Sequence, residues 1–252
     1  MKTYKKVLKG NEAFTLKTES FLPKEEYRHV YNGHIICVTD SKGTPHPDNK
    51  SLLELRVDAS NGFIPLWDRN VILNWRFNKS FGGFFKDAEA AKAGVRKLLG
   101  QAILSWKDAC PVKFHEDDDS WDFEIMIHNT DCDNSGCVLA ASFFPDQGQH
   151  KFYIYQTFFQ QSPQEQQETL EHELGHVFGL RHFFANISET TMKSELFGSD
   201  SSFSIMNYGA KSKLTPADVR DLKRLYQRVW DNQLTEINGT KIRKFTSYHM
   251  SK

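Results

Sequence analysis

The chain has 252 residues, 39% of them hydrophobic, and it carries 32 Lys and Arg against 32 Asp and Glu. Zero net charge without a basic block gives no electrostatic support to nucleic-acid binding. No apolar run reaches the about 18 residues that a membrane span requires. We therefore expect no nucleic-acid partner and no membrane span. The length is sufficient for one large or two modest domains and for a sizeable core.

The beginning of the chain is polar and irregular. We interpret residues 1–62 as an N-terminal extension or pro-like segment, residues 63–233 as the main domain, and residues 234–252 as a C-terminal tail. Residues 1–10 are charged, but no apolar core and small-residue cleavage site follow them, so they are not a secretory signal peptide. We expect a cytoplasmic protein if Met1 is the native start and an extracellular one if a leader has been removed. We also expect a monomer.

The four cysteines are too few for a disulfide framework. Cys132 and Cys137 are close enough in the sequence to close a small loop in an oxidising compartment. Cys37 and Cys110 stand in apolar contexts that are typical of buried thiols.

Hydrophobic periodicity predicts the first regular elements of the main domain. Residues 71–77 and 122–128 have the composition of strands, and residues 87–109 have that of a long helix. The apolar stripe of this helix is expected to be core and consists of Val95, Leu98, Leu99, Ala102, Ile103 and Trp106.

Capping residues predict where two later helices begin. A helix is predicted to begin at Ser162, where an N-cap serine, a proline at the first helical position and Glu165 form a capping box. Another is predicted to begin at the N-cap Thr215 and to run to about residue 233. The Asn238–Gly239 pair predicts a small hairpin in the tail.

The most informative stretch is residues 172–182, HELGHVFGLRH. On a helix, His172 and His176 project from one face and can hold one ion. Glu173 is placed to reach a metal-bound water without binding the metal. Gly179 permits a sharp turn at the end of the helix, and the turn returns His182 as a third ligand.

Three neutral imidazoles leave one position of a tetrahedral Zn²⁺ open for water, which is the arrangement of a catalytic site. Surface histidines on an amphipathic helix would explain neither Glu173 nor Gly179. We therefore predict one catalytic zinc ion, with a zinc-binding but catalytically silent module as the alternative.

This motif resembles that of the metzincin clan of zinc endopeptidases, whose pattern continues to a methionine-containing turn beneath the metal. Residues 204–208 (SIMNY) supply a candidate turn, in which Met206 would form the base of the site. The resemblance to the astacin and serralysin turn implies a tyrosine, here Tyr208, that meets the metal or the oxyanion. The alternative for Tyr208 is packing beneath the site.

Residues 136–145 are similar to the edge strand that matrixin-type members place above the zinc. The resemblance implies that an extended peptide substrate adds to this strand through main-chain hydrogen bonds. The substrate-binding residues would be Val138, Leu139, Ala140 and Ala141.

Two departures from the matrixin pattern concern additional metal ions. Ala140 and Ala141 occupy the neighbourhood where matrixins bind a structural zinc with extra histidines, and only His150 lies nearby, so we predict no structural zinc. Residues 131–136 begin like a calcium loop, but Ser142 stands where the bidentate glutamate should be, so we expect a solvated turn and no calcium.

Other departures concern subfamily and latency. Phe183 replaces the glutamate that follows the third histidine in astacins, so the chain resembles a divergent member near the matrixins. Matrixin propeptides offer a thiolate to the zinc. In this chain Cys37, or instead Asp40 or Asp48, is a candidate ligand that would keep the zinc site latent. The ordinary alternative for Cys37 is a buried thiol in a strand.

The resemblance implies an α+β zincin fold. A twisted mixed sheet would be backed by two helices down to about residue 179, and a smaller part with little regular structure except a final helix would follow. It also implies a zinc endopeptidase acting on protein or peptide substrates, with Glu173 as general base and then general acid. The alternative is a catalytically silent zinc-binding or inhibitory interaction module.

Overall fold

The computed structural model describes residues 12–17, 35–36, 55–59, 61–129, 132–133, 136–182, 194–197, 204–206 and 212–252. Its main sheet has five strands in the order β5-β4-β6-β10-β9. The first four run parallel and β9 is antiparallel to β10. The strand bounds are β4 Ile72–Phe77, β5 Lys113–Glu116, β6 Phe123–His128, β9 Ala140–Ala141 and β10 His150–Tyr155. The predicted strands at 71–77 and 122–128 are therefore confirmed.

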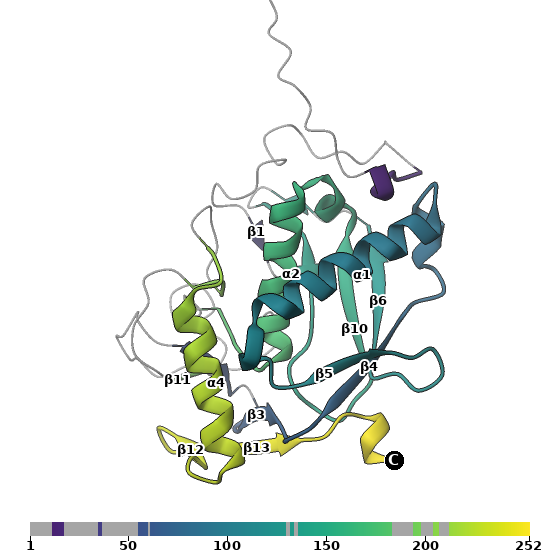
Figure 1. Cartoon of the computed structure of the whole chain (residues 1–252). Helices are drawn as coiled ribbons and strands as arrows, with labels where there is room; N and C mark the ends of the chain where they lie inside the picture. Colours follow the sequence, from purple (N-terminus) through teal and green to yellow (C-terminus); the bar gives the residue numbers. More distant parts are fainter. Residues whose placement is uncertain are drawn as a thin grey trace, which may run out of the picture.

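Two helices, α1 (Ala88–Ser105) and α2 (Pro163–Val177), cross on one face of this sheet (Figure 1). Trp106 joins them, because its Nε1 donates a hydrogen bond of 3.2 Å to the carbonyl of Glu171. The predicted helix over 87–109 is wrong at its end. Lys107 adopts a positive φ of 52°, which an α-helix does not accommodate, and a short 3-10 turn follows. The apolar stripe of α1 lies in the core as predicted, with Ile103 only partly buried.

The described residues also form three small sheets. They are formed by β1 (Ile35–Ile36), β8 (Gly136–Val138) and β7 (Cys132–Asp133), by β2 (Leu55–Asp58) and β11 (Ser194–Phe197), and by β12 (Glu236–Ile237), β13 (Thr240–Phe245) and β3 (Ile64–Trp67). The 3-10 segments are Glu12–Phe14, Phe81–Phe84, Lys107–Ala109, Gln156–Gln160 and His249–Ser251. Strand β11 adds regular structure between residue 179 and the final helix, where none is predicted.

That final helix is α4 (Pro216–Trp230), which begins at the predicted N-cap Thr215 and ends three residues before the predicted end at 233. The hairpin at Asn238–Gly239 is confirmed: both residues have positive φ, at 48° and 81°, as a tight two-residue turn between strands requires. None of the described helices is long and apolar enough to cross a membrane. The helices and mixed sheets confirm the α+β class.

Described residues toward both ends of the chain contribute to the packed structure. Phe14 is buried against Phe159, with ring centroids 5.0 Å apart. Strand β13 pairs in parallel with β3, and the backbone N–H of His249 donates to the buried carboxylate of Asp122 at 2.9 Å. The division at residues 62 and 233 stays a prediction, although described segments on both sides of these positions pack against the residues between them.

Candidate metal centre

Helix α2 positions two of the three predicted ligands. Its start is fixed by the capping box: Ser162 Oγ accepts from the Glu165 N–H at 3.3 Å, and the Glu165 carboxylate accepts from the Ser162 N–H at 2.8 Å. From Thr169 to Val177 every residue is buried. His172 and His176 therefore lie four residues apart in the buried C-terminal half of the helix.

The end of α2 is a Schellman motif. The N–H of Gly179 donates to the carbonyl of His176 at 2.8 Å, and that of Leu180 donates to the carbonyl of Gly175 at 2.9 Å. Gly179 has φ of +87°, and a Cβ on it would lie 2.9 Å from the carbonyl oxygen of Pro65. The left-handed conformation and the close approach both require glycine at this position.

Backbone carbonyls at the end of α2 that have no partner within the helix accept hydrogen bonds from other parts of the chain. Trp67 Nε1 donates to Val177 O at 2.7 Å. The Tyr226 hydroxyl donates to Phe178 O at 3.0 Å, and burial raises the pKa of that hydroxyl. Elements β3 and α4 therefore hold the chain in the direction that leads to His182.

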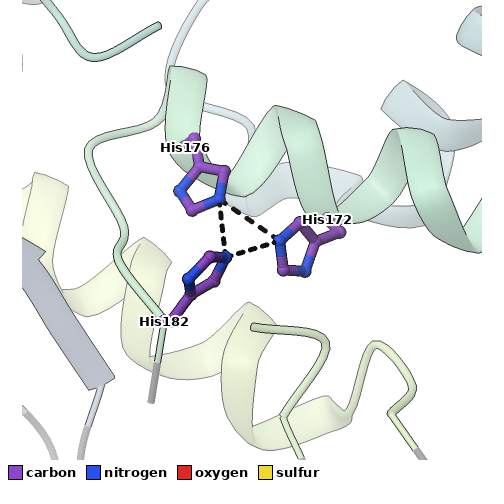
Figure 2. A group of neighbouring side chains, drawn as sticks. All are labelled: His172, His176 and His182. Carbon is purple, nitrogen blue, oxygen red and sulfur yellow. Dashed lines mark hydrogen bonds between the residues drawn. The ribbon is translucent and has the colours of Figure 1, made fainter. Parts of the chain in front are cut away.

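The three imidazoles meet at their Nε2 atoms (Figure 2). The Nε2–Nε2 distances are 3.0 Å between His172 and His182, 3.2 Å between His176 and His172, and 3.2 Å between His176 and His182. His176 and His182 are fully buried and His172 is 8% exposed. Within the described residues, this is the group of His, Cys, Asp or Glu side chains that could hold a metal ion.

The Nδ1 atoms of two of these imidazoles face away from the centre, and their contacts determine the tautomer of each ring. His172 Nδ1 lies 2.8 Å from the carbonyl oxygen of Ile205, and His176 Nδ1 lies 2.7 Å from that of Leu180. A carbonyl accepts only, so both Nδ1 atoms carry the proton and both Nε2 atoms present lone pairs to the centre. Lone pairs that face one another at this distance repel, and a cation held between them removes that repulsion, so the arrangement suits a metal ion.

The triangle fits zinc. Tetrahedral Zn²⁺ with Zn–N bonds of about 2.0–2.1 Å separates its nitrogen ligands by roughly 3.3 Å. The observed Nε2–Nε2 separations of 3.0–3.2 Å are close to that nitrogen–nitrogen distance. Backbone carbonyls that fix the tautomer of metal-binding histidines are the usual outer contacts of such sites.

Glu173 follows the first ligand and is 2% exposed. The Ser142 hydroxyl donates to its backbone carbonyl at 2.9 Å, which links α2 to the segment after β9. The structure thus places this carboxyl-bearing residue in the buried part of α2, directly after the ligand His172. Its catalytic role stays a prediction.

Met206 is 1% exposed and lies against α2. A Cβ on Gly175 would overlap the Met206 sulfur, so the glycine permits this contact directly between the two helical ligands. Ser204 and Ile205 before it are held by the carboxylate of Asp218, whose pKa is raised by desolvation. Tyr208, the other predicted residue of this turn, lies outside the described residues.

The predicted substrate strand divides into two elements. Val138 belongs to β8, whereas Ala140 and Ala141 form β9, the edge of the main sheet, and Leu139 lies between them. All four are at most 4% exposed. Ile36 in β1 is the parallel partner of Val138, so a peptide added at Val138 would compete with β1. The substrate-binding role of these four residues stays a prediction.

The cysteines near this edge have different states. Cys137 is disulfide-bonded, and its Cα partner across the β7–β8 ladder is Cys132. Cys110 is a free thiol. The candidate latency residues Cys37, Asp40 and Asp48 lie outside the described residues.

Sequence reasoning missed several residues around the centre. The ring of Phe144 lies 5.6 Å from that of His176 and 6.0 Å from the guanidinium carbon of Arg181. Arg181 is fully buried, and its Nη1 lies 3.7 Å from a carboxylate oxygen of Asp58, which is 1% exposed. Nothing in the local sequence signals these contacts, except that a charged residue inside the metal motif needs a partner when buried.

Comparisons with known proteins found curated relatives and a similar solved structure. The chain is 28% identical over 148 residues to "Metalloprotease AprA" of Pseudomonas entomophila, and 31% identical over 148 residues to "Stromelysin-3" of Homo sapiens. Each alignment covers 54% of this chain, and the chain spans less than a third of the length of these relatives, 30% and 28%. The solved structure of myroilysin aligns with 69% of this chain and 98% of its own, with a TM-score of 0.43 and 14% identity.

The matrixin family model (Peptidase_M10) matches residues 67–227, which is more than half of the chain and includes all three histidines. Matrixins use a catalytic zinc ion, and the three imidazoles described above form a site that fits it. The chain therefore belongs to the matrixin family of metzincin-type metallopeptidases.

Proposed function

We propose that this chain is a zinc-dependent endopeptidase in which Glu173 acts as general base and then as general acid. The observation that carries the proposal is the convergence of three Nε2 atoms, with Glu173 directly following the first ligand on the same buried helix. Membership of the matrixin family supports a peptidase role.

Zinc, when bound by His172, His176 and His182, supplies a Lewis acid that lowers the pKa of water and polarises a peptide carbonyl. Glu173 accepts the proton of the attacking water and then delivers it to the amine of the leaving peptide. His172 and His176 stay in one tautomer throughout, because their Nδ1–H groups donate to backbone carbonyls.

The substrate is a protein or peptide in extended conformation. Strand β9 is an edge strand, and a further strand can add to such an edge through main-chain hydrogen bonds. Tyr208 would donate a hydrogen bond to the oxyanion that develops on the scissile carbonyl.

The test is cleavage of casein by the purified full chain with and without a chelator, beside Glu173→Ala. We expect chelator-sensitive cleavage that falls by about 10²-fold or more in the variant, while zinc stays bound near one equivalent. Glu168→Ala is the matched control, because Glu168 is a carboxylate on the same helix that contacts Gln164 instead. Its activity should equal that of the wild type.

A chain that binds zinc but cleaves nothing would support the second candidate, a catalytically silent zinc-binding module. Retention of Glu173 argues against that candidate, because a zinc site without turnover has no need of a general base.

A further inference from the structure

Strand β2 lies beside the turn that carries the third zinc ligand. The N–H of Asp58 donates to the carbonyl of Gly179 at 2.9 Å, and the N–H of Arg181 donates to the carbonyl of Arg56 at 3.0 Å. Val57 and Leu180 face each other in an antiparallel bridge between these two bonds. The turn from Gly179 to His182 is therefore held as a strand partner of residues 56–58.

The same strand contributes a buried charge. The Asp58 carboxylate lies 3.7 Å from the Arg181 guanidinium, and the two side chains are 1% and 0% exposed. Arg181 directly precedes the ligand His182, and the Phe144 ring contacts both the Arg181 guanidinium and the ligand His176. A buried arginine so close to a dication raises the cost of binding that dication, and a carboxylate opposite it lowers this cost.

Strand β2 is itself braced on its other side. β11 pairs with it in antiparallel register, with Glu195 opposite Val57. The Glu195 carboxylate accepts from Thr240 Oγ1 at 2.6 Å and from Asn238 Nδ2 at 3.1 Å, both in the C-terminal hairpin. Residues on both sides of the matched family region 67–227 thus take part: β2 pairs directly with the turn of the third ligand, and the C-terminal hairpin supports β2 through Glu195.

We propose that Asp58 is a positioning residue for the third zinc ligand. It holds the Gly179–His182 turn through its backbone N–H and balances the charge of Arg181 through its carboxylate. The inference rests on the proposed zinc site, and it makes β2 part of that site rather than part of a removable leading segment. Any processing of the chain that preserves the site must then occur before Leu55.

The experiment uses the full chain and the variant Asp58→Asn, which keeps the size and the backbone N–H but removes the charge. Two quantities are measured: the zinc dissociation constant, by competition with a chelator, and the visible absorption spectrum of the Co²⁺-substituted protein, which reports the geometry of the ligands. We expect zinc binding to weaken by about tenfold or more and the Co²⁺ spectrum to change.

Asp122→Asn is the matched control. Asp122 is an aspartate of equal burial that accepts hydrogen bonds from the Asn74 N–H and the His249 N–H, and neither residue belongs to the metal centre. This variant should lose thermal stability while its zinc affinity and Co²⁺ spectrum stay at the wild-type values. The comparison separates positioning of the ligand from a general loss of stability.

The inference is overturned if Asp58→Asn and Asp122→Asn lower the melting temperature alike and both keep wild-type zinc affinity and spectrum. If Asp58→Asn does not fold, Arg181→Lys, which keeps the charge but alters the contact with Asp58, is judged by the same two measurements. A wild-type chain that binds no zinc would instead refute the proposed function. The two failures are therefore distinguishable.

Discussion

Replacing Gly179 with alanine is the sharpest test of the turn that carries His182. Alanine in the left-handed conformation at φ +87° costs about 1–2 kcal/mol. The new Cβ would also lie 2.9 Å from the backbone oxygen of Pro65, where no flexible side chain can yield, and such overpacking costs about 1–3 kcal/mol. We therefore expect a total loss of roughly 2–5 kcal/mol in the free energy of unfolding.

Two other glycines separate these contributions in the same chain. Gly62 has φ of +78° with nothing within 4 Å of its Cβ position, so Gly62→Ala should cost only the conformational part. Gly100 lies inside helix α1 and is also open, so Gly100→Ala should stabilise the protein by about 0.5–1 kcal/mol.

The assay is urea denaturation of the three variants and the wild type, followed by far-UV circular dichroism. The expected order of stability is Gly100→Ala, wild type, Gly62→Ala, Gly179→Ala. Zinc affinity should fall only in Gly179→Ala, because Gly179 O pairs with β2 in the turn before His182. Equal losses in Gly179→Ala and Gly62→Ala would refute the close approach to Pro65, and a neutral Gly179→Ala would refute the left-handed turn itself.

Three further predictions concern buried groups. Burial raises the pKa of the Cys110 thiol to about 11, so iodoacetamide at pH 8 should label it only after denaturation, as peptide mass spectrometry would show. Tyr226→Phe removes the donor to Phe178 O and should cost about 1–3 kcal/mol in urea denaturation; an unchanged midpoint would contradict this bond. Desolvation raises the pKa of Asp218 above its usual 3.8, and a raised folded-state pKa gives stability that is present at low pH and lost as pH rises. The stability of the wild type relative to Asp218→Asn should therefore fall as pH rises above about 4, and a constant difference from pH 4 to 8 would count against it.

The parts of the structure that the sequence predicts well are set by neighbouring residues. The capping box at Ser162, the cap at Thr215 and the turn at Asn238–Gly239 each depend on a few adjacent residues, and the structure contains all three. The spacing of the histidines is likewise local to one helix and one turn. The convergence of their Nε2 atoms could therefore be anticipated from residues 172–182 alone.

The parts that could not be predicted depend on pairing across the chain. Strand β2 is too short for a periodic signal, and its partners at Gly179–Arg181 lie about 120 positions later. The parallel pairing of β13 with β3 joins positions still farther apart, such as Ile64 and Ile242. The early end of α1 was missed for another reason. Lys107 adopts a left-handed conformation, and no glycine or proline stands there to indicate that the helix ends.

These two classes of contact meet at the metal centre. The motif supplies the donor atoms, but the lone pairs reach the centre only because backbone carbonyls at Ile205 and Leu180 hold the imidazoles in one tautomer. Those carbonyls are positioned by the contacts of Asp218 and of strand β2, which no short motif specifies. A backbone carbonyl belongs to every residue type, so such a scaffold tolerates wide substitution.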